Sequence, residues 1–213
     1  MGRASSCPSA RIRNLVLGPS IKGRWSYAAS KLIDEFLTLA YWKEKRLPTT
    51  VVRLFNTVGP RQTGQYGMVI PNFVKQALAN EPISVFGDGH QSRCFCHVRD
   101  VIGALERLCR TDKSIGEVFN IGSYEEVTIL QLAERVKLLT GSSSPIELVP
   151  YEKAYEEGFE DMFRRVPDIA KVNACVGFQP TAKLDEILKD VIAFHRNETA
   201  SRSRPPRDGA TTQ

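Results

Sequence analysis

The sequence predicts an α/β fold, because helix-like and strand-like segments alternate along most of the chain. Apolar residues recur at helical spacing in residues 26–45 and again from residue 184 onward, as expected for helices that bury one face. Residues 49–56 form a short, almost continuously apolar run, which is typical of a strand in a parallel sheet covered on both faces. Together these patterns predict a parallel sheet flanked by helices.

The first third of the chain predicts a helix, a strand and a second helix. The strand is the apolar run just described. Residues 69–79 predict a helix with Pro71 in its first turn, where the missing amide hydrogen costs no helical hydrogen bond. The first helix is expected over residues 26–45, with a buried face formed by Leu32, Phe36, Leu39 and Ala40.

The middle of the chain predicts two short strands and a helix. The strands are expected over residues 83–86 and 93–98, on either side of the turn Gly87-Asp88-Gly89. The helix is expected over residues 101–109, with Asp100 as its N-cap.

The last third predicts a strand over residues 117–121 and three helices. Thr128 and Gln131 have the spacing of a capping box, and the helix that they start is expected to end near Gly141. Asp168 is expected to cap a short helix. The last helix is expected to end at His195 and carries an apolar stripe of Leu184, Ile187, Leu188, Val191 and Ile192.

The composition indicates a globular protein without a membrane or nucleic-acid partner. Of the 213 residues, 42% are hydrophobic and 25% are charged, and no apolar run approaches the ~18 residues that a membrane helix needs. The net charge is +5, but much of the excess lies in residues 196–207, a segment rich in Ser, Arg and Pro that is typical of a disordered end. The rest of the chain has no basic stripe interleaved with aromatic residues.

The five cysteines predict reduced thiols. Their number is odd and no export signal is evident, so we expect a cytoplasmic protein. Cys94 and Cys96 lie close enough to suggest a metal site, yet no second cysteine pair and no histidine lies at zinc-site spacing. We therefore expect structural thiols and no bound metal. His97 is expected to be a buried polar group or a residue that supports a site.

The segment Tyr27-Ala28-Ala29-Ser30-Lys31 is the most informative motif, because it places a phenol and an ammonium group on one face of the first helix. The lysine charge favours the phenolate form of the tyrosine, which can then act as a general base near neutral pH. A bare Tyr-x-x-x-Lys spacing is a weak signal, and most such pairs are only part of a helix surface. The motifs downstream therefore decide its meaning.

Further motifs follow in a fixed order. Asn56 ends the apolar strand and precedes Thr57-Val58-Gly59-Pro60-Arg61, at the end of the strand where open α/β sheets bind ligands. The segments 85–89, 92–101 and 164–169 complete the series. Taken together in this order, the motifs resemble the extended short-chain dehydrogenase/reductase family, in particular its sugar-nucleotide epimerases and dehydratases. The resemblance covers about residues 15–196 and is closest to bacterial UDP-glucose 4-epimerase-type proteins.

The resemblance implies the C-terminal part of a Rossmann-type NAD(P)-binding fold plus a small α/β sugar-nucleotide-binding domain. It assigns residues 15–62, together with strand and helix segments from later in the chain, to the cofactor-binding domain. Residues 63–196 belong mainly to the substrate-binding domain. Residues 1–14 are expected to be an irregular N-terminal segment and residues 197–213 a disordered tail. Members of the family form homodimers, and the assembly of this chain stays open.

The resemblance also implies a role for each matched residue. Tyr27 is the catalytic base, Lys31 supports it and binds the cofactor ribose, and Phe55 lies beside the nicotinamide of NAD. The residues that would bind the UDP-sugar are Asn56 and Val69 near the diphosphate or sugar, Ser84 and Phe86 at the uracil, and Arg93 with Arg164 or Arg165 on the diphosphate.

The implied reaction is the NAD-dependent epimerisation of a sugar nucleotide through a transient 4-keto intermediate. A UDP-glucuronate decarboxylase, a 4,6-dehydratase and a non-catalytic sugar-nucleotide-binding domain remain alternatives. The sequence contains no G-x-x-G-x-x-G or G-x-G-x-x-G turn for the cofactor pyrophosphate, and the third catalytic residue of the family, a Ser or Thr, would lie before Met1. We therefore expect a C-terminal portion of such an enzyme that is inactive alone and does not bind NAD.

Overall fold

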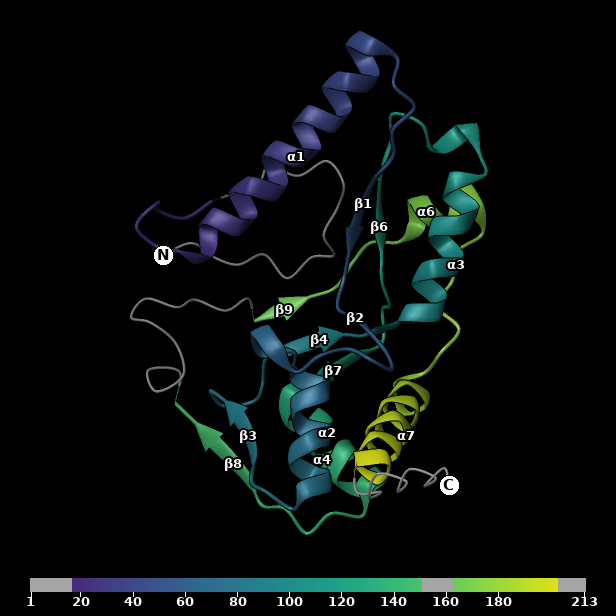
Figure 1. The fold of residues 1–213 in the computed structure, drawn as a ribbon. Helices are drawn as coiled ribbons and strands as arrows, with labels where there is room; N and C mark the ends of the chain where they lie inside the picture. Colours follow the sequence, from purple (N-terminus) through teal and green to yellow (C-terminus); the bar gives the residue numbers. More distant parts are fainter. Residues whose placement is uncertain (1–16, 151–162, 203–213) are drawn as a thin grey trace, which may run out of the picture.

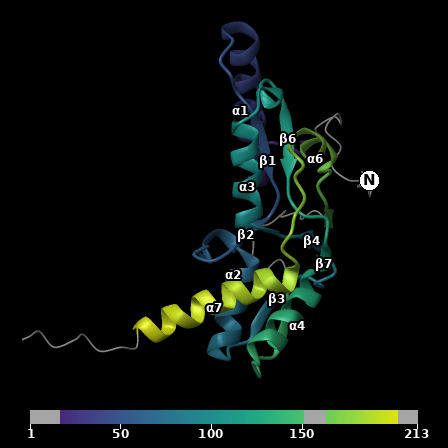
Figure 2. The ribbon, with the colours of Figure 1, turned by 90° about the vertical axis from the view of Figure 1, so that its right-hand side faces the viewer.

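The computed structural model describes residues 17–150 and 163–202, so the expectation for residues 1–14 lies outside the described residues. Helices and strands alternate along these ranges, as predicted for an α/β fold. Figures 1 and 2 place α1, α3 and α6 at one end of the molecule and α2, α4 and α7 at the other. The strands that connect the two ends position the candidate site.

Two pairs of parallel strands belong to the two ends (Figure 1). β1 (Val51–Leu54) pairs with β6 (Val118–Ile121), and β3 (Ile83–Phe86) pairs with β8 (Ile146–Val149). The parallel pairing that the apolar run predicts for β1 is confirmed. The prediction that both faces of this strand are covered is wrong, because Leu54 is 48% exposed.

Shorter ladders join the two ends. The strand expected over residues 93–98 is divided at Phe95, because its two halves pair with different partners. The first half, β4, pairs antiparallel with β7 and parallel with β9, and the second half, β5, pairs parallel with β2. These strands are β2 (Thr57–Val58), β4 (Ser92–Cys94), β5 (Cys96–His97), β7 (Glu126–Thr128) and β9 (Arg164–Arg165).

The helices begin and end near their predicted positions where the local signals are strong. The capping box of α4 is confirmed: the Thr128 hydroxyl accepts the N–H of Gln131, and the Gln131 side-chain oxygen accepts the N–H of Thr128, both at 3.1 Å. Gly141 ends this helix with a φ of 68°. None of the described helices combines the length and apolar character needed to cross a bilayer. The helices are α1 (Arg24–Lys45), α2 (Val69–Ala79), α3 (Val98–Cys109), α4 (Ile129–Thr140), α6 (Ala170–Val176) and α7 (Leu184–Arg202), with short 3₁₀ turns at Gln65–Gly67 and Asp112–Ser114.

The N-cap of α3 differs from the prediction. His97 occupies the cap position, and its Nδ1 accepts the N–H of Arg99 at 3.0 Å. Asp100 lies in the first turn of the helix. Its carboxylate instead accepts hydrogen bonds from Thr181 and Ala182, which precede α7. The carboxylate of Asp100 thus bonds to a segment distant in sequence rather than capping its own helix as the sequence suggested.

The C-terminal helices also differ from the prediction. Ile169 is the N-cap residue of α6, although Asp168 still accepts a hydrogen bond at 2.9 Å from the first N–H of the helix. α7 does not end at His195, which is buried within the helix. Residues 197–202 are therefore helical rather than part of a disordered tail, and residues 203–213 lie outside the described ranges.

The hydrophobic core consists of two clusters. The first lies among α2, α4, α7 and β3, and it includes the whole apolar stripe predicted for α7. The second contains Phe119 of β6 and Phe178, with apolar residues of α3 and α6. The division of the chain into a cofactor-binding and a substrate-binding domain near residue 62 stays a prediction.

The predicted buried face of α1 is wrong. Phe36 is 65% exposed, and Leu32, Leu39 and Ala40 are only partly buried. β1 is the main neighbour of α1 within the described ranges, and Arg53 of β1 donates two hydrogen bonds to Glu35, at 2.9 and 2.5 Å. The helical periodicity located an apolar face, but the described segments cover it only in part.

Asp100 provides a test of how α3 is joined to the segment before α7. Burial raises the pKa of this carboxyl, but the hydrogen bonds from Thr181 and Ala182 outweigh burial and hold its pKa below the ordinary value of 3.8. Folding lowers the pKa of Asp100. The ionised carboxylate therefore stabilises the fold fully at pH values above the pKa that Asp100 has in the unfolded chain. The contribution is lost as the pH falls through the lower pKa of the folded state.

We expect Asp100→Asn to lower the free energy of unfolding by about 1–2 kcal/mol at pH 7, because charge-assisted hydrogen bonds are replaced by weaker ones. At pH 3 the difference from the parent chain should be smaller. Urea titrations at the two pH values measure both effects, with the exposed Asp112→Asn as the control. An equal loss at pH 7 and pH 3 would contradict the role of the ionised carboxylate.

Candidate functional site

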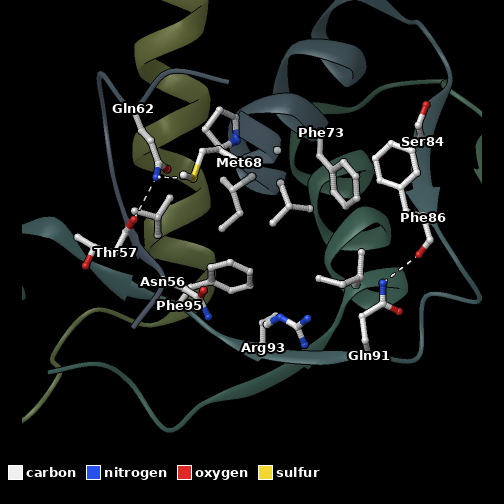
Figure 3. Close-up of a pocket in the computed structure, with 16 residues that line it drawn as sticks. Asn56, Thr57, Gln62, Met68, Phe73, Ser84, Phe86, Gln91, Arg93 and Phe95 are labelled. Carbon is white, nitrogen blue, oxygen red and sulfur yellow. Dashed lines mark hydrogen bonds between the residues drawn. The ribbon is translucent and has the colours of Figure 1, made fainter. Parts of the chain in front are cut away.

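A cavity of about 210 Å³ lies between the strands that join the two ends of the molecule and the helix α2. Figure 3 shows polar side chains on several of its walls and apolar ones between them. The structure brings together five of the predicted substrate residues here: Asn56, Val69, Ser84, Phe86 and Arg93. The cavity is also lined by Thr57, Val58, Gln62, Met68, Ile70, Phe73, Gln91, Phe95 and Ile129, which the sequence analysis did not select.

Asn56 holds the end of β1 against two other strands. Its φ is 35°, in a region that asparagine adopts more readily than most residues. Its side-chain Nδ2 donates to the carbonyl of Cys94 at 2.9 Å, and its own carbonyl accepts the N–H of Cys96 at 3.2 Å. These bonds fix the position of Asn56 in the cavity wall. The amide has a second N–H and an oxygen that can serve a ligand.

The two late arginines have different surroundings. Side chains alternate along a strand, so Arg164 and Arg165 lie on opposite faces of β9. Arg165 is in register with Arg93 of β4, and its guanidinium lies 5.5 Å from the centre of the Phe55 ring. Arg164 is ion-paired with Glu126 at 2.5 Å, and the hydrogen bond from Arg164 lowers the pKa of Glu126. The structure thus brings Arg165, rather than Arg164, alongside Arg93.

Close packing at Gly122 explains why Arg165 lies over Phe55. A Cβ atom at Gly122 would lie 2.8 Å from both Phe55 Cβ and Pro167 Cγ. Only glycine therefore allows the end of β1 and the segment after β9 to approach this closely. Phe55 is itself 7% exposed and belongs to the core. Arg165 packs against the ring that was expected to lie beside the nicotinamide.

Two glutamine side chains bond to the outer edge of β3. Alternate N–H groups of this strand bond to β8, so those of Ser84 and Phe86 point to the opposite edge. Gln76 accepts the N–H of Ser84 at 3.2 Å and donates to its hydroxyl at 3.3 Å. Gln91 is buried and donates to the carbonyl of Phe86 at 2.9 Å. Glutamine side chains thus already bond to backbone groups of both residues that were expected at the uracil.

The loop before α2 forms a further wall. Gln62 donates to the carbonyl of Thr57 at 3.1 Å and lies 3.5 Å from the sulfur of Met68 (Figure 3). This loop has no periodic sequence pattern, and only the pair Gly59-Pro60 signals a turn. The positions of Gln62 and Met68 in the cavity wall therefore become evident only from the structure.

Tyr27 and Lys31 lie outside the lining of this cavity. The ammonium of Lys31 lies 5.9 Å from the centre of the Tyr27 ring, in agreement with the shared helical face that the spacing predicts. Tyr27 is 71% exposed. The hydrogen bond that Lys31 donates to Asp34, with the charge of that carboxylate, raises the pKa of Lys31 and so favours its charged form. The catalytic role of the pair stays a prediction.

The neighbouring thiols of Cys94 and Cys96 are both buried. Burial raises the pKa of each to about 12, so both thiols are protonated at neutral pH. Within the ranges that the structure describes, no group of three or more His, Cys, Asp or Glu side chains is arranged to hold a metal ion.

Comparison with known proteins identifies the family. The family model described as GDP-mannose 4,6 dehydratase matches residues 19–191, which is most of the chain. The chain belongs to this family. It is an extended short-chain dehydrogenase/reductase, and the resemblance inferred from the motifs is confirmed. Members of the family are NAD-dependent epimerases, dehydratases and decarboxylases of sugar nucleotides.

Three proteins illustrate the range of its relatives. UDP-N-acetyl-alpha-D-glucosaminuronate decarboxylase of Bacillus cytotoxicus is 41% identical over 181 residues, which are 84% of this chain and 56% of that protein. UDP-glucuronic acid decarboxylase 1 of Danio rerio is 35% identical over 82% of this chain and 40% of that protein. UDP-glucuronic acid 4-epimerase from Bacillus cereus, solved with UDP-glucuronic acid and NAD, superposes with a TM-score of 0.74 at 26% identity, over 87% of this chain and 58% of that one. The chain spans about half the length of such relatives.

The assignment of Tyr27 and Lys31 to the nicotinamide-ribose end of NAD stays a prediction. The two side chains share an exposed helical face, which leaves them accessible to a ligand. The sequence contains no glycine-rich turn that matches the pyrophosphate site. The fit of these residues to the cofactor is therefore partial.

The buried thiols predict selective labelling. In the native chain at pH 7.5, iodoacetamide should modify the exposed Cys109 at least roughly 100-fold faster than Cys94 or Cys96, because only accessible thiolate reacts. Peptide mass spectrometry measures the modified fraction at each position. In guanidinium chloride all three should react at similar rates, which provides the control. Similar native rates at Cys94 and Cys109 would show that the thiols near the cavity are accessible.

Proposed function

We propose that this chain forms the UDP-sugar-binding part of an NAD-dependent sugar-nucleotide enzyme and that its substrates are UDP-uronic acids. The observation that carries the proposal is the alignment of Arg93 with Arg165 across the β4–β9 ladder, beside a partly apolar cavity. Two guanidinium groups on one face supply the planar, charge-assisted donors that a diphosphate requires.

The cavity is suited to the nucleoside end of such a ligand. Its volume of about 210 Å³ is below the ~300–1,000 Å³ of pockets that enclose a whole drug-sized molecule. The aromatic rings of Phe73, Phe86 and Phe95 offer apolar surface to a flat base. The diphosphate would then lie at Arg93 and Arg165, with the sugar extending beyond them.

The relatives support uronic acids as the sugar class. Two decarboxylases and one epimerase named above act, by their names, on UDP-sugars that carry a carboxylate. Decarboxylation is our first candidate reaction, because the two decarboxylases are the more similar in sequence, at 41% and 35% identity. Epimerisation is the second candidate, supported by the structural neighbour. The narrower expectation of a UDP-glucose 4-epimerase has not been confirmed.

In either reaction Tyr27 would remove the proton of the sugar C4 hydroxyl and return it later. Lys31, whose charged form Asp34 favours, would stabilise the phenolate. NAD, when bound, supplies the chemistry of accepting and returning a hydride. Arg93 and Arg165 would hold the diphosphate while the sugar reacts, so that binding energy far from the reacting carbon serves to position it.

The arginine pair provides the first test. We expect Arg93→Ala and Arg165→Ala each to weaken UDP binding about tenfold or more, because each removes a charge-assisted contact worth about 1.5–3 kcal/mol. Arg164→Ala is the matched control, since Arg164 is adjacent in sequence but is paired with Glu126, and it should change UDP affinity less than twofold.

Isothermal titration calorimetry or ligand-observed NMR measures these affinities. If the parent chain does not bind UDP, the proposed function is wrong. If Arg164→Ala weakens binding as much as Arg165→Ala, the assignment of the second diphosphate ligand is wrong.

The sugar class has its own test. We expect UDP-glucuronic acid to bind a few-fold more tightly than UDP-glucose, because the relatives that support the proposal act, by their names, on UDP-sugars that carry a carboxylate. Tyr27→Phe should leave both affinities nearly unchanged, since this residue is assigned to proton transfer. Equal affinities for the two ligands would contradict a preference for uronic acids while leaving the arginine assignment intact.

A further inference from the structure

His97 lies at the boundary between the two hydrophobic clusters. It is the last residue of β5, and its side chain is 2% exposed. The preceding Cys96 belongs to the cluster around Phe119, whereas Val58, opposite His97 on β2, belongs to the cluster around α7. A polar ring removed from water in this way depends on protein groups to satisfy its nitrogens.

Groups from two helices face these nitrogens. Nδ1 accepts the N–H of Arg99 at 3.0 Å, so the proton of a neutral ring lies on Nε2. Nε2 lies 3.3 Å from Oδ2 of Asp190 on α7. The geometry is not that of a regular hydrogen bond, and Nε2 has no other hydrogen-bond partner among the described residues. The guanidinium of Arg99 donates to the same oxygen at 2.5 Å. Asp190 thus accepts a hydrogen bond from Arg99 and also lies beside Nε2 of His97.

The ring of His97 also supports a strand in the cavity wall. Val58 pairs with His97 in the β2–β5 ladder, and Val58 lines the candidate cavity. The next residue, Gly59, lies so close to α3 that a Cβ there would be 2.6 Å from Val98 Cγ1 and 3.9 Å from His97 Cε1. The ring of His97 therefore lies beside the backbone of Gly59, immediately after β2.

A ligand site at the same place is less well supported. A hollow of about 480 Å³ lies beside His97 and Asp190, but its other carboxylates are already engaged. Asp100 accepts hydrogen bonds from Thr181, and Glu186 accepts the N–H of Lys183. The contacts are those of a junction between α3 and α7.

We propose that Asp190 is a positioning residue for the candidate cavity, acting through the ring of His97 on strand β2. Asp190 keeps the Nε2–H form of His97 directed at α7, and the fixed ring keeps Val58 and Gly59 in place. Asp190 is outside the lining of the cavity, so it has no direct contact with a ligand there. The effect on binding rests on the proposed function, whereas the effect on β2 does not.

The test compares Asp190→Ala, which removes the acceptor, with Asp190→Asn, which keeps a side-chain oxygen for Nε2–H. Lys189→Ala, an exposed neighbour on the same helix, is the control. Side-chain ¹⁵N NMR reports the tautomer of His97, amide shifts report Val58 and Gly59, and calorimetry reports the affinity for UDP. Circular dichroism confirms that each variant is folded.

We expect Asp190→Ala to shift the ring ¹⁵N signals of His97, to shift the amides of Val58 and Gly59, and to weaken UDP binding roughly tenfold. The tautomer itself should not change, because Nδ1 still accepts the N–H of Arg99. Asp190→Asn should keep ring signals near those of the parent and stay within about twofold of the parent affinity, as should Lys189→Ala. If Asp190→Ala leaves the amides of β2 unchanged, or weakens UDP binding without changing His97, the proposal is wrong. If the parent chain itself fails to bind UDP, the proposed function is wrong, and the His97 ring signals and the amide shifts alone decide whether Asp190 positions β2.

Discussion

The hydrogen bond from Asn56 to the carbonyl of Cys94 is the contact on which the arrangement of the site depends. It joins the end of β1, which belongs to one end of the molecule, to β4, which carries Arg93. Because Asn56 adopts a left-handed φ, the chain can leave β1 and immediately form β2 beside β5. A residue with a branched side chain would adopt this φ at a considerable cost and would offer no amide to β4.

Arg164 and Arg165 are adjacent in sequence but have different surroundings in the structure. Arg164 lies on the face of β9 where Glu126 from β7 meets it, and the pair is held within the three-stranded ladder. Arg165 lies on the other face, over the ring of Phe55 and in register with Arg93. Arg93 and Arg165 are therefore on the face of the ladder where we propose that the diphosphate binds.

The sequence predicted those parts of the structure that depend on local signals. The capping box of α4, the apolar stripe of α7 and the parallel pairing of β1 follow from spacing and composition alone. The predictions were wrong where the contacts or burial of a residue depend on a segment distant in sequence. Asp100 has the identity of a helix cap, but Thr181 and Ala182 recruit its carboxylate from far along the chain. Phe36 has the spacing of a core residue, but a helical period cannot reveal whether another segment covers it.

In the candidate site, too, residues with a local sequence signal were predicted and residues without one were missed. Asn56, Val69, Ser84, Phe86 and Arg93 were found through motifs, and the fold brings them to one cavity. Gln62 and Gln91 were missed because they act from loops, where amide side chains carry no periodic signal. Relatives with different reactions match this same chain, so the groups that we propose to hold the nucleoside and diphosphate would serve more than one chemistry. Because these groups would hold the part of the substrate that does not react, we expect selectivity between decarboxylation and epimerisation to come from side chains that touch the sugar ring and its carboxylate.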